Sequence, residues 1–402
     1  MDTITHGIAG ALISKAAFGG RDLFPPFEVH KKKLATWALT LGAIFPDADV
    51  LREFFSSNPL LMITWHRSIT HSLLMLPIWS VLLATAMAAV ARWRKWQAPS
   101  FLFLTGLFAA GIFSHILLDL LTDFGTMIWS PLDWSRPAWD TLFIIDFTLT
   151  GILLVPQLLA WTYEDPDHTR RRAIIMWAIF TPAPLLISRI GLAVGAPVSN
   201  TAILIATVMF TVLFFFPAAR GWGLRVRYEN WNRAGLLLAM AYILAAAFAH
   251  RVALDRVQQF ASQQKLEVEA FGAMPLPPSL WHWDGLVRAP RGVYEIRYDL
   301  SDDLFKSRDT SAEAGEVITR TFYPDALPNE YIAIARQLPD VQKVLWFERF
   351  PVIQFHKEGG DAIVEFSDKR FAQIRRDRPS SFTYRVRFSA DGKSITQGWV
   401  RR

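Results

Sequence analysis

Long apolar blocks separated by short polar loops occupy the first 250 residues of the chain. A helix that crosses a bilayer needs about 20 apolar residues, within a range of roughly 17–25. Blocks of that kind occur at 72–91, 100–121, 141–161, 173–190, 201–217 and 234–250. Two weaker blocks, 3–19 and 34–51, precede them, and either could be a re-entrant or surface helix. The pattern predicts a mainly α-helical, polytopic membrane domain over 1–250 with about eight embedded segments.

Residues 251–402 have a different pattern, in which short apolar runs alternate with polar positions. This part opens with a predicted helix and a proline-rich stretch at 274–278. Predicted strands follow at 293–298, 344–347, 363–366 and 384–388, and Asp391-Gly392 is typical of a hairpin turn. The pattern predicts a smaller, sheet-rich α+β domain outside the membrane.

The composition supports a lipid environment and narrows the chemistry. Charged residues make up 19% of the chain, against about 25% in soluble domains. There is no cysteine, which excludes disulfides, thiolate metal sites and cysteine nucleophiles. Any metal ion must therefore be held by histidine nitrogen and carboxylate oxygen. Residues 251–402 carry 23 basic and 21 acidic side chains, so no nucleic-acid partner is expected.

Lysine and arginine concentrate in alternate loops of the first 250 residues. Fourteen lie within the loops near 21–33, 92–95, 170–172 and 220–233, whereas the intervening loops hold four: Arg52, Arg67, Arg136 and Arg189. Loops rich in these residues are usually cytoplasmic. Both termini, and all residues after 250, are therefore predicted on the extracytoplasmic (periplasmic) side.

The stretch FSHILLDLLTDFGT contains His115, Asp119 and Asp123 at a spacing of four. Side chains four residues apart lie on one face of a helix, so a rigid helix could present His115 and Asp119 to one ion. Ionisable groups in a membrane segment are costly and usually functional. The alternative is a histidine at a helix end with two solvated carboxylates.

Residues 66–72 read HRSITHS and place two histidines five positions apart. His66 and His71 do not share a helix face, but they converge if the first lies in a loop and the second opens a helix. Arg67 between them could hold an anionic group such as phosphate. The alternative is a polar loop whose Ser or Thr caps the following helix.

Two further acidic pairs and one histidine complete the candidates. Asp47 and Asp49 follow a proline, which suits either a ligand pair or a turn. His6 lies among small residues that favour close helix packing, and it could be structural. Asp140 and Asp146 occur in WDTLFIIDF, where Asp146 could orient a ligand histidine or begin a helix.

The predicted topology brings these groups to one face of the membrane. The predicted metal ligands are His6, Asp47, Asp49, His66, His71, His115, Asp119 and Asp123. Histidine and carboxylate ligands suit zinc, with manganese or iron as other possibilities.

Short motifs in residues 1–150 resemble a known family. THGIAGALI, GAIFPDADVL, HRSITHSLL and FSHILLDLLTDFGT, with WDTLFIIDF as a looser extension, resemble the inner-membrane metal-dependent hydrolases described as LexA-binding. The resemblance implies a membrane-bound hydrolase in the inner (plasma) membrane. The LexA-binding description implies a cytoplasmic partner for some members, and it is not carried over because the loop charges place these motifs outside.

The order of the ligands is also similar, more distantly, to zinc-dependent phospholipase C and single-strand nucleases. That resemblance implies a first metal site made of Asp47 or Asp49, His66 or His71, His115 and Asp119, with Asp119 bridging to an ion at His6. The chain has no second His-x-x-x-Glu/Asp pair after Asp123 and no N-terminal tryptophan, so we expect one or two metal ions rather than three.

These observations predict a metal-dependent hydrolase that acts on a phosphoester or lipid-linked substrate at the outer membrane interface. The predicted catalytic residues are Asp49, Arg67 and Asp123, with Arg67 holding phosphate and one of Asp47, Asp49 or Asp123 acting as general base. Two alternatives stay open. One is a metal or proton transporter, and the other is a metal-stabilised scaffold whose C-terminal domain binds a partner protein.

Overall fold

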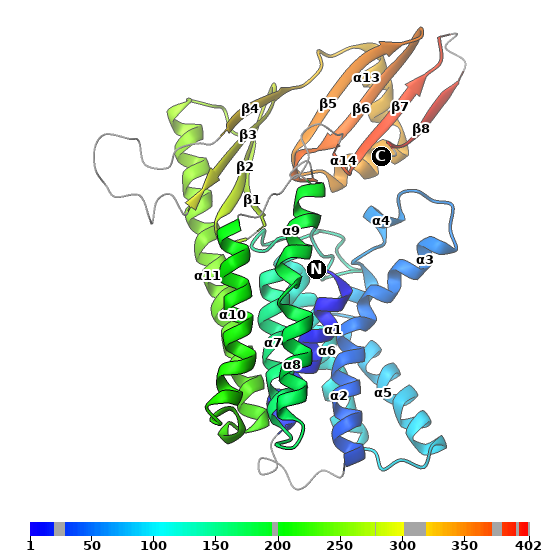
Figure 1. Ribbon diagram of the computed structural model, residues 1–402. Coiled ribbons are helices and arrows are strands. Elements are labelled where there is room, and N and C mark those ends of the chain that lie inside the picture. Colours follow the sequence, from blue (N-terminus) through cyan, green and yellow to red (C-terminus); the bar gives the residue numbers. More distant parts are fainter. Residues whose placement is uncertain are drawn as a thin grey trace.

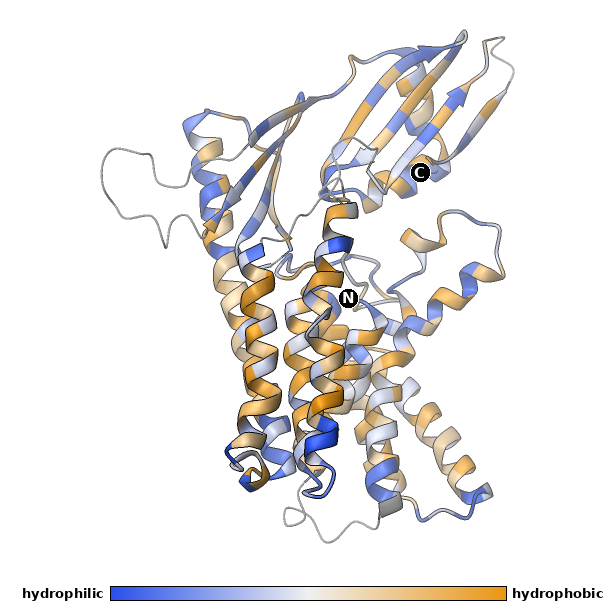
Figure 2. Cartoon of the chain, viewed as in Figure 1, coloured by the Kyte–Doolittle hydropathy of each residue, from blue (hydrophilic) through white to orange (hydrophobic). Residues whose placement is uncertain are grey.

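The computed structural model describes residues 1–19, 29–194, 200–277, 279–300, 319–371, 380–390 and 394–400. A bundle of long helices carries two four-stranded antiparallel sheets at one end (Figure 1). Apolar residues dominate the middle of the bundle, and polar residues gather at its ends and alternate along the strands (Figure 2). A helical N-terminal part followed by a sheet-rich C-terminal part confirms the broad architecture that the hydropathy pattern predicts.

The helical part consists of long and short helices in sequence. The helices of twelve residues or more are α1 (Thr3–Phe18), α2 (Val29–Ile44), α5 (Leu76–Trp93), α6 (Phe101–Leu120), α7 (Phe147–Tyr163), α8 (Thr169–Phe180), α9 (Ala183–Val194), α10 (Asn200–Ala219) and α11 (Tyr228–Gln263). The shorter ones are α3 (Leu51–Phe54), α4 (Leu61–Thr64) and the 3-10 helices η1 (Phe45–Val50), η2 (Ile69–His71) and η3 (Gly223–Arg225).

Five helical segments of the described chain are long and apolar enough to cross a membrane, not eight. They are Lys31–Phe54, Leu76–Trp93, Phe101–Leu120, Asn200–Ala219 and Tyr228–Gln263. The expected segment 3–19 forms a helix of only 16 residues. The expected segment 173–190 is split into two 12-residue helices at Pro182, because proline lacks the amide hydrogen that a continuous helix needs. The expected segment 141–161 forms the shorter helix Phe147–Tyr163.

The basic loops gather at one end of the bundle. Helices α2, α8 and α11 begin, and α5 ends, at the end opposite the sheets (Figure 1), and that end is hydrophilic (Figure 2). This arrangement is the one that the loop charges predict, although Arg21 lies outside the described residues. Which side of the membrane this end faces stays a prediction.

Helices α1, α2 and α6 pack closely through glycine. A Cβ atom added to Gly10 of α1 would lie 2.7 Å from the carbonyl oxygen of Leu39, and one added to Gly111 of α6 would lie 2.6 Å from the same oxygen. Small residues of this kind let helix backbones approach in a bilayer. The close packing brings His6 on α1 beside His115 on α6, and their rings stack with centroids 3.6 Å apart.

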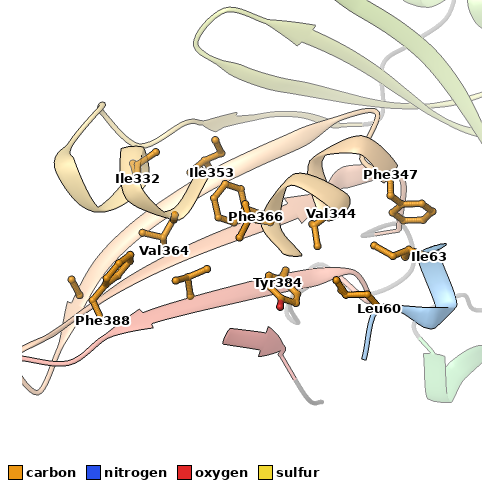
Figure 3. Close-up of a cluster of buried hydrophobic side chains, with 14 of the residues drawn as sticks. Leu60, Ile63, Ile332, Val344, Phe347, Ile353, Val364, Phe366, Tyr384 and Phe388 are labelled. Atoms are coloured by element: carbon orange, nitrogen blue, oxygen red, sulfur yellow. The ribbon is translucent and has the colours of Figure 1, made fainter. Parts of the chain in front are cut away.

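The C-terminal part contains two separate sheets. The first has the order β1 (Ala270–Leu276), β2 (His282–Ala289), β3 (Gly292–Asp299), β4 (Thr319–Pro324), and the second has the order β5 (Pro351–Glu358), β6 (Asp361–Asp368), β7 (Thr383–Phe388), β8 (Ile395–Trp399). Helices α13 (Glu330–Gln337) and α14 (Pro339–Phe347) pack against the second sheet (Figure 3). Antiparallel pairing places Val364 opposite both Phe355 and Val386.

Three of the four predicted strands are confirmed and one is wrong. Residues 293–298, 363–366 and 384–388 lie in β3, β6 and β7, whereas 344–347 end helix α14. Pro339 begins this helix, and the buried Val341, Val344 and Phe347 recur at a spacing of three. A four-residue apolar run alone does not distinguish a helix from a strand. The Asp391-Gly392 turn lies outside the described residues.

The two parts meet in a shared hydrophobic cluster. Leu60, which precedes α4, and Ile63 of α4 pack with Phe347 and the second sheet (Figure 3). The indole Nε1 of Trp399 donates a hydrogen bond of 2.6 Å to the carbonyl of Pro59. Helix α11 also continues past residue 250 as far as Gln263 and leads to β1. The division into domains 1–250 and 251–402 stays a prediction.

Candidate metal centre

Four side chains from three separate segments converge on one point. Asp47 comes from η1, which follows the apolar helix α2, and His71 comes from η2. His115 and Asp119 lie one turn apart on α6. Each residue offers one ligand atom, and the four atoms lie within 4.8 Å of one another. This group could hold a metal ion.

The distances between these atoms fit a small divalent cation. The Nε2 atoms of His71 and His115 lie 3.0 Å apart. Asp119 Oδ2 lies 3.3 and 3.4 Å from these two nitrogens, and Asp47 Oδ1 lies 3.7 and 3.4 Å from them. Zinc bonds to nitrogen and oxygen are about 2.0–2.2 Å long, so the ligand atoms of a tetrahedral zinc site lie roughly 3.3–3.6 Å apart.

The hydrogen bonds of the two imidazoles direct their lone pairs to the centre. His115 Nδ1 lies 2.6 Å from the carbonyl oxygen of Ala43, which can only accept, so Nδ1 carries the proton and Nε2 is free to bind a cation. His71 Nδ1 faces Thr70 Oγ1 at 3.1 Å and Asp49 Oδ2 at 3.5 Å. Asp119 Oδ2 is buried and has no hydrogen-bond partner among the described residues. A cation would satisfy this oxygen, so the residues present fit a metal ion.

The other oxygen of Asp119 is held by cationic groups. Arg67 Nη2 lies 3.0 Å from Asp119 Oδ1, and the amino group of Met1 contacts the same oxygen. His6 Nε2 lies 3.2 Å from it. His6 therefore contacts two of the four residues, Asp119 and the stacked His115, without belonging to the group. Arg67 also donates a hydrogen bond of 2.8 Å to Thr122, so its guanidinium is engaged in positioning Asp119.

Asp49 organises the loop that carries the two histidines. Its carboxylate lies 2.9 Å from His66 Nδ1 and accepts hydrogen bonds from the Arg67 amide at 3.0 Å and the Thr70 hydroxyl at 3.1 Å. Arg67 has φ of +62°, an uncommon conformation for a residue other than glycine. The carboxylate contacts hold this turn in place. Asp49 and His66 thus lie beside the four converging residues and outside them.

The remaining acidic candidates are placed elsewhere. Asp123 lies outside the group of four, and burial raises its pKa to about 6. Asp140 forms a two-pronged ion pair with Arg349 of the C-terminal part, at 2.9 and 2.8 Å. Asp146 caps α7 and also accepts hydrogen bonds from Tyr242 and Ser279. The structure thus places Asp146 at a helix start, away from the ligand histidines.

The four converging residues and the neighbouring His66 differ in burial and in charge. The side chains of His71, His115 and Asp119 are fully buried, whereas Asp47 is 10% exposed and His66 is 14% exposed. Burial alone would lower the pKa of His71, but its carboxylate neighbours outweigh that effect and raise the pKa to about 10. The same negative surroundings favour a bound cation. Burial lowers the pKa of His66, which keeps it neutral near pH 7.

The sequence patterns did not predict several residues that contact the site. Thr3 donates a hydrogen bond of 2.5 Å to Asp47 Oδ2, and Thr122 and Thr70 support Arg67 and Asp49 as described above. Arg370, buried in the C-terminal part, donates a hydrogen bond to the backbone of Asp123. Thr70 stands within the HRSITHS motif, but no pattern along the chain connects Thr3, Thr122 or Arg370 with this site.

Comparison with known proteins gives one match. No curated protein and no solved structure matches the chain. A family model described as YdjM inner membrane protein matches residues 1–193, a range that contains all four residues of the candidate metal centre. Together with the five candidate spans, this match supports a multi-pass inner-membrane protein whose residues 1–193 are similar to the YdjM inner membrane protein family.

Proposed function

We propose that the protein is a membrane-bound, metal-dependent hydrolase that acts on a phosphoester or lipid-linked substrate at the membrane interface. The observation that carries the proposal is the convergence of two imidazole nitrogens and two carboxylate oxygens, at distances that suit a divalent cation. Zinc is the first choice for this donor set, with manganese or iron as alternatives. The extracytoplasmic position of the site is part of the proposal.

The exposed edge of the cluster suggests where the substrate and water approach. The side chains of Asp47, in the group of four, and of His66, beside it, are partly exposed. The phosphoester therefore enters beside these two residues. A divalent ion at the four ligands would polarise a phosphoryl oxygen and make water more acidic. His66, oriented by Asp49, is neutral near pH 7 and is suited to take the proton from the attacking water. The water oxygen bonds to phosphorus while the bond from phosphorus to the leaving alcohol breaks, and the alcohol departs with the proton that His66 took from the water.

This assignment changes the roles expected from the sequence for Asp49 and Arg67, and it gives the general-base role to His66 instead of an aspartate such as Asp123. Asp49 is engaged by His66, Arg67 and Thr70, so we propose it as the group that orients His66 rather than as the base. The guanidinium of Arg67 faces Asp119 and Thr122. We therefore propose that Arg67 positions the carboxylate of Asp119. The phosphate would be held mainly by the metal ion at the group of four.

The test begins with metal content, measured by mass spectrometry on detergent-purified protein. Wild type is expected to hold about one ion per chain at the group of four, and His115→Ala is expected to lose it. His168→Ala is the matched control, because His168 forms an exposed pair with Asp165 where α8 begins, at the end of the bundle opposite the sheets. A screen of phosphomonoesters and phosphodiesters then follows, with the same variants.

The outcomes separate the proposal from its alternatives. Hydrolysis that disappears in His115→Ala and persists in His168→Ala supports the enzyme. Absence of metal in wild type, even after reconstitution, would sink the proposal. Bound metal without turnover of any ester favours the scaffold, and metal uptake into proteoliposomes favours the transporter.

A further inference from the structure

An apolar cavity of about 730 Å³ lies beside the metal centre, between α2, α5 and α6. Its size falls within the ~300–1,000 Å³ of small-molecule sites. Most of its wall is aliphatic or aromatic, with Leu34 and Trp37 from α2 and Leu83 and Met87 from α5. An apolar cavity of this kind suits a hydrocarbon group rather than a polar metabolite.

The cavity reaches the candidate metal centre at one of its four residues, Asp47. Asp47 and Thr3 supply the one carboxylate and the one hydroxyl among its lining residues. Asp47 Oδ1 faces His71 and His115, while its Oδ2 accepts the hydrogen bond from Thr3. The same side chain therefore borders both the cavity and the group of four. A ligand in the cavity would have its polar end at the metal and its apolar end away from it.

The cavity has the direction and depth of a lipid chain. On α2 its lining extends from Leu34 to Ile44, which corresponds to roughly 15 Å at 1.5 Å per residue. That length is about half of the ~30 Å hydrocarbon core of a bilayer, or one leaflet. Both α2 and α5 lead from the level of the chain's N-terminus toward the end of the bundle opposite the sheets (Figure 1). The cavity therefore runs along the helices, in the direction that lipid chains take.

The cavity is open toward the bilayer rather than sealed in the protein. Trp37 on α2 is 59% exposed and Val90 on α5 is 48% exposed, and both line it. Since both helices belong to candidate spans, this opening faces lipid. A hydrocarbon chain can enter sideways from the membrane without crossing water.

We propose that this cavity holds one hydrocarbon chain of a lipid substrate whose phosphoester head group lies at the metal centre. The inference rests on the proposed hydrolase and names its substrate class as a phospholipid or another long-chain phosphoester. The continuity of the cavity with Asp47 selects an amphiphile, because a polar head group at the group of four would lie directly beside an apolar chain in the cavity.

Two alanines on α5 provide a matched pair for the test. Ala86 lines the cavity, whereas Ala89, three residues further on, is also exposed but does not line it. Ala86→Trp fills the cavity with an indole ring, and Ala89→Trp places the same ring on the lipid-facing surface. Both variants should keep the metal content of wild type, which verifies that each is folded.

The first measurement is labelling by a lipid that does not need to be hydrolysed. The protein is reconstituted in phosphatidylethanolamine–phosphatidylglycerol vesicles that contain phosphatidylglycerol with a diazirine in its acyl chain. Illumination should label wild type and Ala89→Trp at Leu83 and Met87, and Ala86→Trp should reduce that labelling roughly tenfold, the effect of about 1.4 kcal/mol. Even labelling over all lipid-facing helices, or labelling that Ala86→Trp leaves unchanged, would overturn the inference.

The second measurement separates this inference from the proposed activity. If the protein hydrolyses bis(p-nitrophenyl) phosphate, Ala86→Trp should leave that water-soluble reaction unchanged and slow cleavage of long-chain lipid. Equal loss of both reactions contradicts a chain-binding role. Specific labelling with no hydrolysis of any ester would uphold the lipid site and refute the hydrolase.

Discussion

Arg370 donates a hydrogen bond of 2.7 Å from Nη1 to the backbone carbonyl of Asp123. Arg370 lies in the C-terminal part, while Asp123 lies one turn beyond the candidate ligand Asp119. The same guanidinium binds the carboxylate of Asp368 and the carbonyl of Phe347. A single buried cation thus joins the segment that follows α6, the helix of His115 and Asp119, to the second sheet and to α14.

Replacing Arg370 by methionine should destabilise the protein strongly. The variant leaves the buried Asp368 without its cation and two carbonyl groups without a donor, and breaking a buried ion pair costs about 3–5 kcal/mol. Arg387→Met is the control, because its ion pair with Asp361 is largely exposed and contributes little. Thermal unfolding of the two variants in detergent should show a much larger loss for Arg370→Met. Equal losses of thermal stability would mean that the contacts of Arg370 with Asp123 and Asp368 contribute little to holding the two parts of the protein together.

Replacing Asp49 by asparagine should weaken metal binding without removing a ligand. Asp49 holds His66, Thr70 and the backbone of the turn, and it faces His71 Nδ1 at 3.5 Å. Loss of such a supporting carboxylate typically lowers metal affinity by about 10–100-fold. Asp47→Asn replaces a charged ligand oxygen by the neutral oxygen of an amide and should have the larger effect. Competition with a chelator of known affinity compares the two, and unchanged affinity in Asp49→Asn would limit that residue to shaping the loop.

Replacing Gly111 by alanine should disturb both packing and metal binding. The added methyl group would lie 2.6 Å from the carbonyl oxygen of Leu39 and 2.9 Å from the amide nitrogen of Ala43, so α6 must move away from α2. Overpacking of this kind costs about 1–3 kcal/mol. The movement also strains the contact of His115 with Ala43.

Gly106→Ala is the internal control for that change. Gly106 lies on the same helix, and a Cβ atom added there meets nothing within 4 Å. It should therefore keep the thermal stability and metal content of wild type, whereas Gly111→Ala loses part of both. If the two variants behave alike, the close approach of α6 to α2 is not required for the site.

Glu348 should make the stability of the protein depend on pH. Burial, assisted by the nearby Asp368 carboxylate, raises the pKa of Glu348 well above its usual value of 4.5. A raised pKa means that the fold favours the protonated form, so the contribution to stability is complete below pH 4.5 and is lost as the pH rises through the raised pKa. Both carboxylate oxygens are buried and have no hydrogen-bond partner among the described residues.

Replacing Glu348 by glutamine removes this titration. The variant should unfold at a higher temperature than wild type at pH 8, by roughly the 2–4 °C that about 1 kcal/mol produces in a domain of 150–250 residues. The difference should shrink toward pH 4.5, where wild type is protonated. Thermal unfolding at both pH values tests this, and a variant that is less stable than wild type at pH 8 would contradict the assignment.

Part of the candidate site follows directly from the order of residues. His115 and Asp119 are four apart in an apolar stretch, and because a helix turns once in 3.6 residues, their neighbouring positions follow from the spacing alone. The apolar blocks likewise predict helices. They do not predict which helices reach the length of a span, since Pro182 divides one block and another forms a helix of only 16 residues.

Only the folded structure shows which of two similar aspartates, and which of two similar histidines, belong to the group of four. From the sequence, Asp47 and Asp49 were equivalent, as were His66 and His71. The structure brings Asp47 and His71 to the group of four and pairs Asp49 with His66 beside it. The turn at Arg67, with its positive φ, lies between the two imidazoles, and neither residue spacing nor composition encodes which of them joins the group of four.

The sequence by itself determined the membrane character, the helical and sheet-rich parts, and the residue types that could bind a cation, because hydropathy and helical spacing are local properties. Only the tertiary structure decided that Gly10 and Gly111 bring α1 and α6 to the same carbonyl of α2, and that Arg370 reaches Asp123 across 247 positions. It also placed Asp47 at the border between the candidate metal centre and the apolar cavity. Contacts of this kind depend on how helices pack, which no short segment of the chain contains.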